Sequence, residues 1–158
     1  LGDLLRFFPD ALEIRSRIGI ARAWTDQDYK KAMTFARSMK GSPQLKAEDM
    51  AALKTLLAGH RDFLLRLLEN PNLLEHEQFT DLLWALFHLA EELECRPSLD
   101  NLPPHDIAHL AGDIERVYSN LAVEWLLYVQ HLKAQYPYLY SLVLRTHPLQ
   151  DNPSPTVE

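Results

Sequence analysis

Apolar residues recur every three or four positions along almost the whole chain, and this spacing constrains the fold more than any other feature. Residues three or four places apart lie on one face of an α-helix, so the pattern predicts amphipathic helices around a common core. Glycine occurs only five times in 158 residues, and no Asn-Gly or Asp-Gly hairpin turn is present. The sequence therefore predicts an all-α fold.

Turn and capping residues divide this pattern into about five helices. The predicted helices cover residues 9–24, 25–40, 46–69, 75–96 and 105–136, and a short helical turn is expected after Pro137. Thr25 followed three residues later by Asp28 is the pattern of a capping box at the second helix. Because short connections between long helices favour antiparallel neighbours, we expect an antiparallel helical bundle.

Charge is distributed unevenly along the chain. Residues 1–46 hold nine Lys and Arg against five Asp and Glu, whereas residues 47–158 hold seven against seventeen. We therefore expect a basic N-terminal helical segment over residues 1–44, a helical bundle core over 45–147 and a disordered tail over 148–158. The acidic body would repel phosphate, so no nucleic acid is expected as a partner.

Three side chains near the start of the longest predicted helix have the spacing of metal ligands. His105, His109 and Asp113 are four residues apart, which places all three on one helix face. The string HDIAH also resembles the HExxH motif of zinc proteases, with Asp106 in place of glutamate. One hypothesis is therefore a metal-binding helical bundle with hydrolytic activity through these three residues. The alternative is an ordinary solvated helix start.

A second polar group lies on the helix predicted over residues 75–96. His88, Glu91, Glu92 and Cys95 share helical spacing. We expect His88 to be partly buried beside Leu89, and Glu91, Glu92 and Glu94 to form a solvated acidic face. Acidic neighbours disfavour a thiolate, which argues against Cys95 as a nucleophile. No Gly-rich phosphate loop and no GxSxG string is present. The sequence therefore predicts no catalytic residue, no enzyme activity and no cofactor.

Aromatic residues gather at the end of the longest predicted helix. Trp125 and Tyr128 lie on its last turns, and Tyr136, Tyr138 and Tyr140 alternate in the turn that follows. Aromatic rings bury well both in a core and in a protein interface. We expect these residues either to cap the bundle or to contact a partner.

Two stretches of the chain resemble a known family. They read ENPNLLEHEQFTDLLWALFHLAEEL over residues 69–93 and HLAGDIERVYSNLAVEWLLYVQHLKAQYPYLYSLVLRT over residues 109–146. Together they are similar to the cytosolic C-terminal region of small prokaryotic ion-channel-like membrane proteins, which are related to two-helix potassium channels. The resemblance covers roughly residues 69–147 and supplies no functional residues to carry over.

The resemblance implies a non-catalytic regulatory or assembly domain at the cytoplasmic face of a membrane, acting through helix packing and homo-oligomerisation. The chain begins at Leu1 and holds no run of ~18–20 apolar residues, so the membrane segment is expected outside it. The basic segment over residues 1–44 would then be juxtamembrane, as the positive-inside rule predicts.

Overall fold

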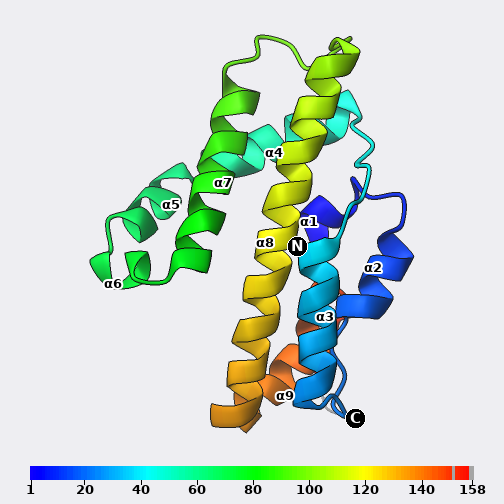
Figure 1. Cartoon of the computed structure of the whole chain (residues 1–158), viewed down its shortest axis with the longest axis vertical. Helices are drawn as coiled ribbons and strands as arrows, with labels where there is room; N and C mark the ends of the chain where they lie inside the picture. The colour runs from blue at the N-terminus through cyan, green and yellow to red at the C-terminus, as the bar shows by residue number, and fades with distance from the viewer. Residues whose placement is uncertain (151, 157–158) are drawn as a thin grey trace.

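The computed structural model describes residues 1–150 and 152–156 of the chain, and in these residues it is entirely helical (Figure 1). The described part forms nine helices, which are α1 (Gly2–Leu5), α2 (Ala11–Ile18), α3 (Asp26–Ser38), α4 (Ala47–Gly59), α5 (Arg61–Leu68), α6 (Pro71–Leu74), α7 (Glu77–Glu94), α8 (Pro104–Gln135) and α9 (Pro137–Thr146). The all-α prediction is confirmed, and the number of helices exceeds the five expected.

The extra helices arise where the predicted ones are interrupted. The helix expected over residues 46–69 is divided into α4 and α5 at His60, whose φ of −106° and ψ of 3° leave the helical range. Glycine weakens a helix interior, and Gly59 stands directly before this break. The turn expected after Pro137 is instead the ten-residue helix α9. The capping box of Thr25 and Asp28 is present at the start of α3.

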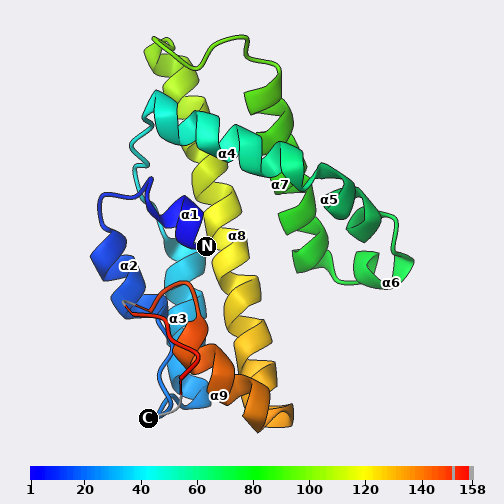
Figure 2. The same ribbon diagram turned by 180° about the vertical axis from the view of Figure 1, so that it is seen from behind.

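Helix α8 is the centre of the molecule. It is 32 residues long and packs against α7, α3 and α9 (Figure 1). Its buried residues follow helical spacing and include Leu110, Ile114, Val117, Val123, Leu126 and Val129. Helices α3 and α7 both run opposite to α8, whereas α4 crosses the back of α7 and α8 (Figure 2). The fold therefore contains antiparallel neighbours but is not a simple up-and-down bundle.

One hydrophobic core joins residues from both ends of the chain. Phe8 from the N-terminal segment is buried with its ring 4.8 Å from that of Tyr118 on α8. Leu149, in the stretch expected to be a disordered tail, is 5% exposed and belongs to the same core. Residues 151, 157 and 158 of that stretch lie outside the described residues. The core therefore draws on all three segments into which charge and composition divide the chain.

None of the helices in the described residues combines the length and the apolar character that crossing a membrane would need.

Candidate metal centre

The seam between α7 and α8 brings together two histidines and two carboxylates. On α7, His88 is followed four residues later by Glu92, and on α8, His109 is followed four residues later by Asp113. Residues four apart share a helix face, and the two helices pack side by side in opposite directions. The two pairs therefore meet, and we call His88, Glu92, His109 and Asp113 the seam cluster.

Several polar atoms of the seam cluster lie at the spacing of ligands around one metal ion. Asp113 Oδ2 lies 3.3 Å from His88 Nε2 and 3.3 Å from His109 Nε2. The Glu92 carboxylate lies 3.5 Å from His109 Nε2 and 3.9 Å from His88 Nε2. Zinc ligands about 2.0–2.2 Å from a tetrahedral ion are roughly 3.3–3.6 Å from each other. The distances from Asp113 Oδ2 to both rings and from Glu92 Oε2 to His109 fall in this range, whereas the distance from Glu92 Oε1 to His88 is longer. Among the described residues, His88, Glu92 and His109 are the three whose ligand atoms all lie within 4.8 Å of one another.

Asp113 is the buried member of the cluster, and one of its oxygens accepts no hydrogen bond. The residue is 2% exposed, and its Oδ1 accepts a hydrogen bond of 3.1 Å from Arg116 Nη1. Oδ2 is buried and accepts no hydrogen bond from any described residue, although both imidazole rings are close to it. Buried carboxylate oxygens are normally paired, because an unpaired one loses its hydration without compensation. Oδ2 is therefore available to a cation.

Arg96 holds the rim of the cluster in place. Its guanidinium donates to both oxygens of Asp106 on α8, at 3.0 and 2.5 Å, and to Glu92 Oε2 at 2.6 Å. These hydrogen bonds lower the pKa of the Glu92 carboxyl and the pKa of the Asp106 carboxyl. The Glu92 oxygen that lies 3.5 Å from His109 Nε2 is therefore already bonded to Arg96.

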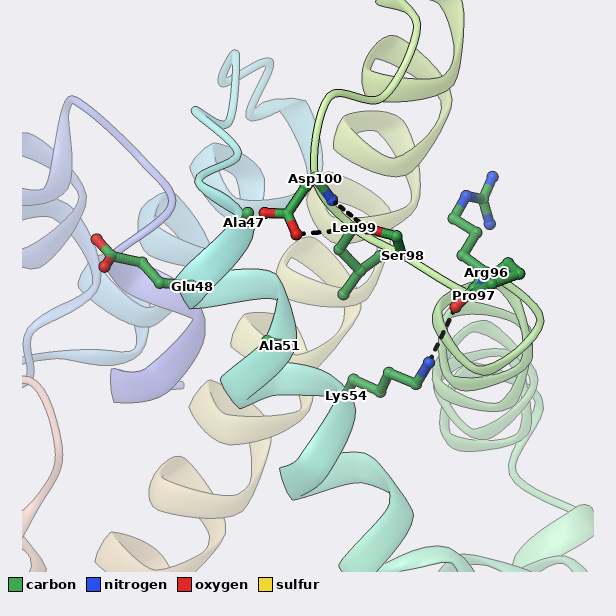
Figure 3. A pocket seen from close by; sticks show the side chains of 9 residues that line it. All are labelled: Ala47, Glu48, Ala51, Lys54, Arg96, Pro97, Ser98, Leu99 and Asp100. Carbon is green, nitrogen blue, oxygen red and sulfur yellow. Dashed lines mark hydrogen bonds between the residues drawn. The ribbon is translucent and has the colours of Figure 1, made fainter.

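A pocket between α4 and residues 96–100 adjoins this rim (Figure 3). Lys54 reaches across it from α4, and its Nζ donates to the carbonyl oxygens of Glu94 at 3.4 Å and Arg96 at 3.1 Å. Cations favour the C-terminal end of a helix, where carbonyl groups lack partners. Lys54 therefore caps α7 and fixes the backbone from which the Arg96 side chain extends.

The structure retains only part of the predicted metal set. His109 and Asp113 lie in the seam cluster, whereas His105 is exposed one turn earlier and forms no ion pair with any described residue. His105 lies in the first turn of α8, beyond the level at which His88 and Glu92 of α7 face this helix. Asp106, at the position of the protease glutamate, pairs instead with Arg96.

His88 was expected to be partly buried and Glu92 to lie on a solvated face; their side chains are 44% and 27% exposed, and both lie in the seam cluster. The sequence contains a signal for them, because His-x-x-x-Glu on α7 and His-x-x-x-Asp on α8 repeat one spacing on consecutive helices. Glu91 and Cys95 are exposed, as expected for that face. Pairing the two motifs required knowing which faces of α7 and α8 meet.

The predicted aromatic set is divided between the surface and the core. Tyr128, Tyr136 and Tyr138 are 52%, 43% and 71% exposed. Tyr140 is 6% exposed, and its hydroxyl donates to the carbonyl oxygen of Ala21 at 3.1 Å. Tyr140 therefore contributes to packing between α9 and the N-terminal segment, and the three exposed tyrosines are the ones accessible to a partner.

The sequence was compared with known proteins and structures. The model of a family described as "Uncharacterized protein MJ1433, C-terminal helical domain" matches residues 1–145. The chain is also 47% identical over 149 residues to "Uncharacterized protein MJ1433" of Methanocaldococcus jannaschii, covering 94% of this chain and 60% of that protein. No solved structure matches the chain. Neither description mentions an ion channel or a membrane.

Proposed function

We propose that this chain, which belongs to the family of the MJ1433 C-terminal helical domain, binds one divalent transition-metal ion in the seam cluster between α7 and α8. The observation that carries the proposal is the buried Oδ2 of Asp113, which accepts no hydrogen bond and lies 3.3 Å from Nε2 of both His88 and His109. Imidazole and carboxylate together suit Zn²⁺, Fe²⁺, Co²⁺ or Mn²⁺. The bound ion would join α7 to α8 beside the core.

Metal analysis of the purified chain tests the proposal. We expect one ion per chain after dialysis of protein made without a histidine tag, measured by inductively coupled plasma mass spectrometry. Calorimetric titration of metal-free protein with Zn²⁺ or Co²⁺ should give the same stoichiometry. His109→Ala and Asp113→Asn should each lose the ion, because each removes a ligand atom from the cluster.

His105→Ala is the matched control for this experiment. His105 lies one turn before His109 on the same helix but outside the cluster, so its removal should leave the stoichiometry unchanged. Equal loss of metal in His105→Ala and His109→Ala would favour the triad of His105, His109 and Asp113 instead. Metal-free protein that takes up no ion in either measurement would refute the proposal.

Hydrolysis is a separate proposal that the HDIAH string suggests. Asp106 is held by Arg96 and is therefore poorly placed to act as a general base. Glu92 lies within 3.5 Å of His109 and is the carboxylate nearest to the histidines after Asp113. Ester hydrolysis by metal-loaded protein that is absent from metal-free protein would support a hydrolytic role. Equal rates of ester hydrolysis in the two forms would rule that role out.

A second candidate function is assembly through the exposed aromatic end of α8 and α9. Tyr136 and Tyr138 are exposed there with ring centres 6.4 Å apart, beside the exposed Leu139 and Leu142. Exposed clusters of large apolar side chains mark contact surfaces between proteins. Sedimentation analysis should show a defined homo-oligomer that dissociates in the double variant Tyr136→Ser, Tyr138→Ser. A monomer at all concentrations would exclude this candidate.

Attachment to a channel-like membrane protein extends this second candidate and depends on the resemblance over residues 69–147. The basic charge of the N-terminal segment is compatible with a juxtamembrane position. Translating the reading frame upstream of Leu1 tests it. Two apolar helices there would support membrane attachment, and a preceding segment without them would remove it.

A further inference from the structure

The seam cluster is closed on the core side and open on the solvent side. The Asp113 side chain is 3% exposed and forms the floor, whereas the side chains of His88 and His109 are 44% and 48% exposed. Metal sites that bind an external ligand keep a coordination position open, whereas purely structural sites are closed by protein groups. The exposure of both histidines leaves room for a ligand from solvent.

Glu92 is the weakest of the four protein ligands because Arg96 competes for it. Glu92 Oε2 accepts a hydrogen bond of 2.6 Å from Arg96 Nη1, and Arg96 is itself fixed by two bonds to Asp106. While Arg96 is bonded to Glu92, a bound ion would be coordinated by His88, His109 and Asp113. Two histidines and one carboxylate with open positions form a ligand set that binds small molecules in iron and zinc proteins.

Arg116 places a partly exposed cation next to Asp113 of the cluster. It lies three residues after Asp113 on α8, and Nη1 donates to Asp113 Oδ1 at 3.1 Å. Its side chain is 58% exposed, and its other N–H groups have no partner among the described residues. The planar guanidinium fork matches the oxygens of phosphate and carboxylate groups.

Charge favours an anion at the same place. The directly contacting groups are the carboxylates of Glu92, Asp106 and Asp113 and the guanidiniums of Arg96 and Arg116. With neutral histidines and a divalent ion, these groups leave one net positive charge in the loaded site. A bound cation is often the largest local charge and decides which ligands are attracted.

We infer that the metal-loaded seam cluster binds an exogenous oxyanion, a phosphate or carboxylate group, between the ion and Arg116. This inference rests on the metal binding proposed above. One oxygen of the anion would fill the open coordination position, and another would accept hydrogen bonds from the exposed part of Arg116. The ligand class follows from the combination of a metal ion, an arginine fork and an accessible mouth.

Cobalt substitution provides the test, because the visible absorption of bound Co²⁺ responds to changes in its ligands. The full chain is loaded with one Co²⁺ and titrated separately with inorganic phosphate and with acetate. We expect a saturable change in the spectrum with at least one anion while Co²⁺ stays bound after gel filtration. The anion that acts at lower concentration identifies the class of ligand.

In protein loaded with one Co²⁺ per chain, Arg116→Gln should weaken binding of that anion about tenfold, the effect of losing one charge-assisted hydrogen bond. Arg66→Gln on α5 is the matched control, since Arg66 contacts only the carbonyl oxygen of Asp62 among the described residues. A Co²⁺-loaded protein whose absorption spectrum does not change with either anion would overturn this inference and leave metal binding intact. An anion affinity of Arg116→Gln equal to that of the parent would do the same. Failure to take up Co²⁺ would instead refute the metal proposal itself.

Discussion

Asp113 combines burial, negative charge and an unpaired oxygen in one side chain. Such a group is costly in a folded protein unless a cation or donor satisfies it. Arg116 satisfies Oδ1, and the two imidazoles lie 3.3 Å from Oδ2, which accepts no hydrogen bond. Under the metal binding proposed above, this residue would link the stability of the fold to occupancy of the seam cluster.

Asp113→Asn should abolish stabilisation of the fold by metal. An ion at a hundredfold excess over its Kd raises the free energy of unfolding by about 2.7 kcal/mol, because it binds only the folded chain. Thermal unfolding with and without Zn²⁺ measures this as a rise in Tm. We expect the rise in the parent and in His105→Ala and none in Asp113→Asn; a parental Tm that ignores the ion would contradict the expectation.

Arg96→Met should weaken the fold more at neutral pH than in acid. Arg96 lowers the pKa of the Glu92 carboxyl, so this ion pair stabilises the fold above the ordinary carboxyl pKa of about 4.3. Its contribution is lost as the pH falls through the lowered pKa of the folded state. Urea unfolding at several pH values between 7 and 3 should therefore show the two proteins converging at low pH.

Arg61→Met is the control for that measurement. Arg61 pairs with Glu94 at 3.3 Å, but the two side chains are 42% and 65% exposed. Exposed pairs of this kind contribute about 0–1 kcal/mol. A pH dependence of Arg96→Met equal to that of Arg61→Met would mean that Arg96 does not hold Glu92 in solution.

At the scale of helices, α7 and α8 form the frame of the site. Each presents one ligand pair, and the link between them supplies Arg96, which bonds to both helices. Helix α4 contributes through Lys54, which caps the end of α7. The site therefore depends on the register of one helix pair, and shifting α7 along α8 by a turn would separate the histidines.

Gly112→Ala in α8 should stabilise the fold. A methyl group at position 112 meets nothing within 4 Å, and alanine is favoured over glycine in a helix by about 0.8–1 kcal/mol. Urea unfolding should show the gain without a change in metal stoichiometry. Gly41→Ala is the contrasting case, because a Cβ there would lie 2.6 Å from the Phe8 ring, and this variant should be destabilised. A loss of stability in Gly112→Ala would show that α8 is constrained there by other contacts.

At the scale of the molecule, both ends of the chain contribute to one core around α8. Phe8 packs on Tyr118, and Leu149 is buried in the same cluster. The C-terminal stretch is also tied back by Ser154, whose N–H donates to the carbonyl oxygen of Arg145 at 2.9 Å. Removing either end should therefore affect the stability of the whole domain.

Leu149→Ala should destabilise the protein by about 2–3 kcal/mol, since it leaves a cavity in the core. For a domain of this length, Tm should fall by roughly 5–10 °C. Leu12→Ala is the control, because Leu12 is 83% exposed and its removal should change Tm little. Equal Tm values for Leu149→Ala and the parent would mean that this stretch is detached in solution.

Helical spacing of apolar residues was sufficient to predict the all-α class and the positions of α3, α7 and α8. It was insufficient at His60, where a break in backbone geometry divides one apolar stripe between α4 and α5. Charge and composition singled out residues 1–44 and 148–158 but carried no information on where Phe8 and Leu149 pack. Packing partners depend on contacts distant in sequence.

The sequence by itself determined which residues can share a helix face, because that follows from 3.6 residues per turn. It therefore placed His88 with Glu92 and His109 with Asp113 as two separate pairs. Only the tertiary structure decided that the pairs meet, that Asp113 is buried and that His105 lies outside. The physical reason is that the cluster combines groups from two helices, and the register and rotation of one helix against another are set by the packing of the whole core.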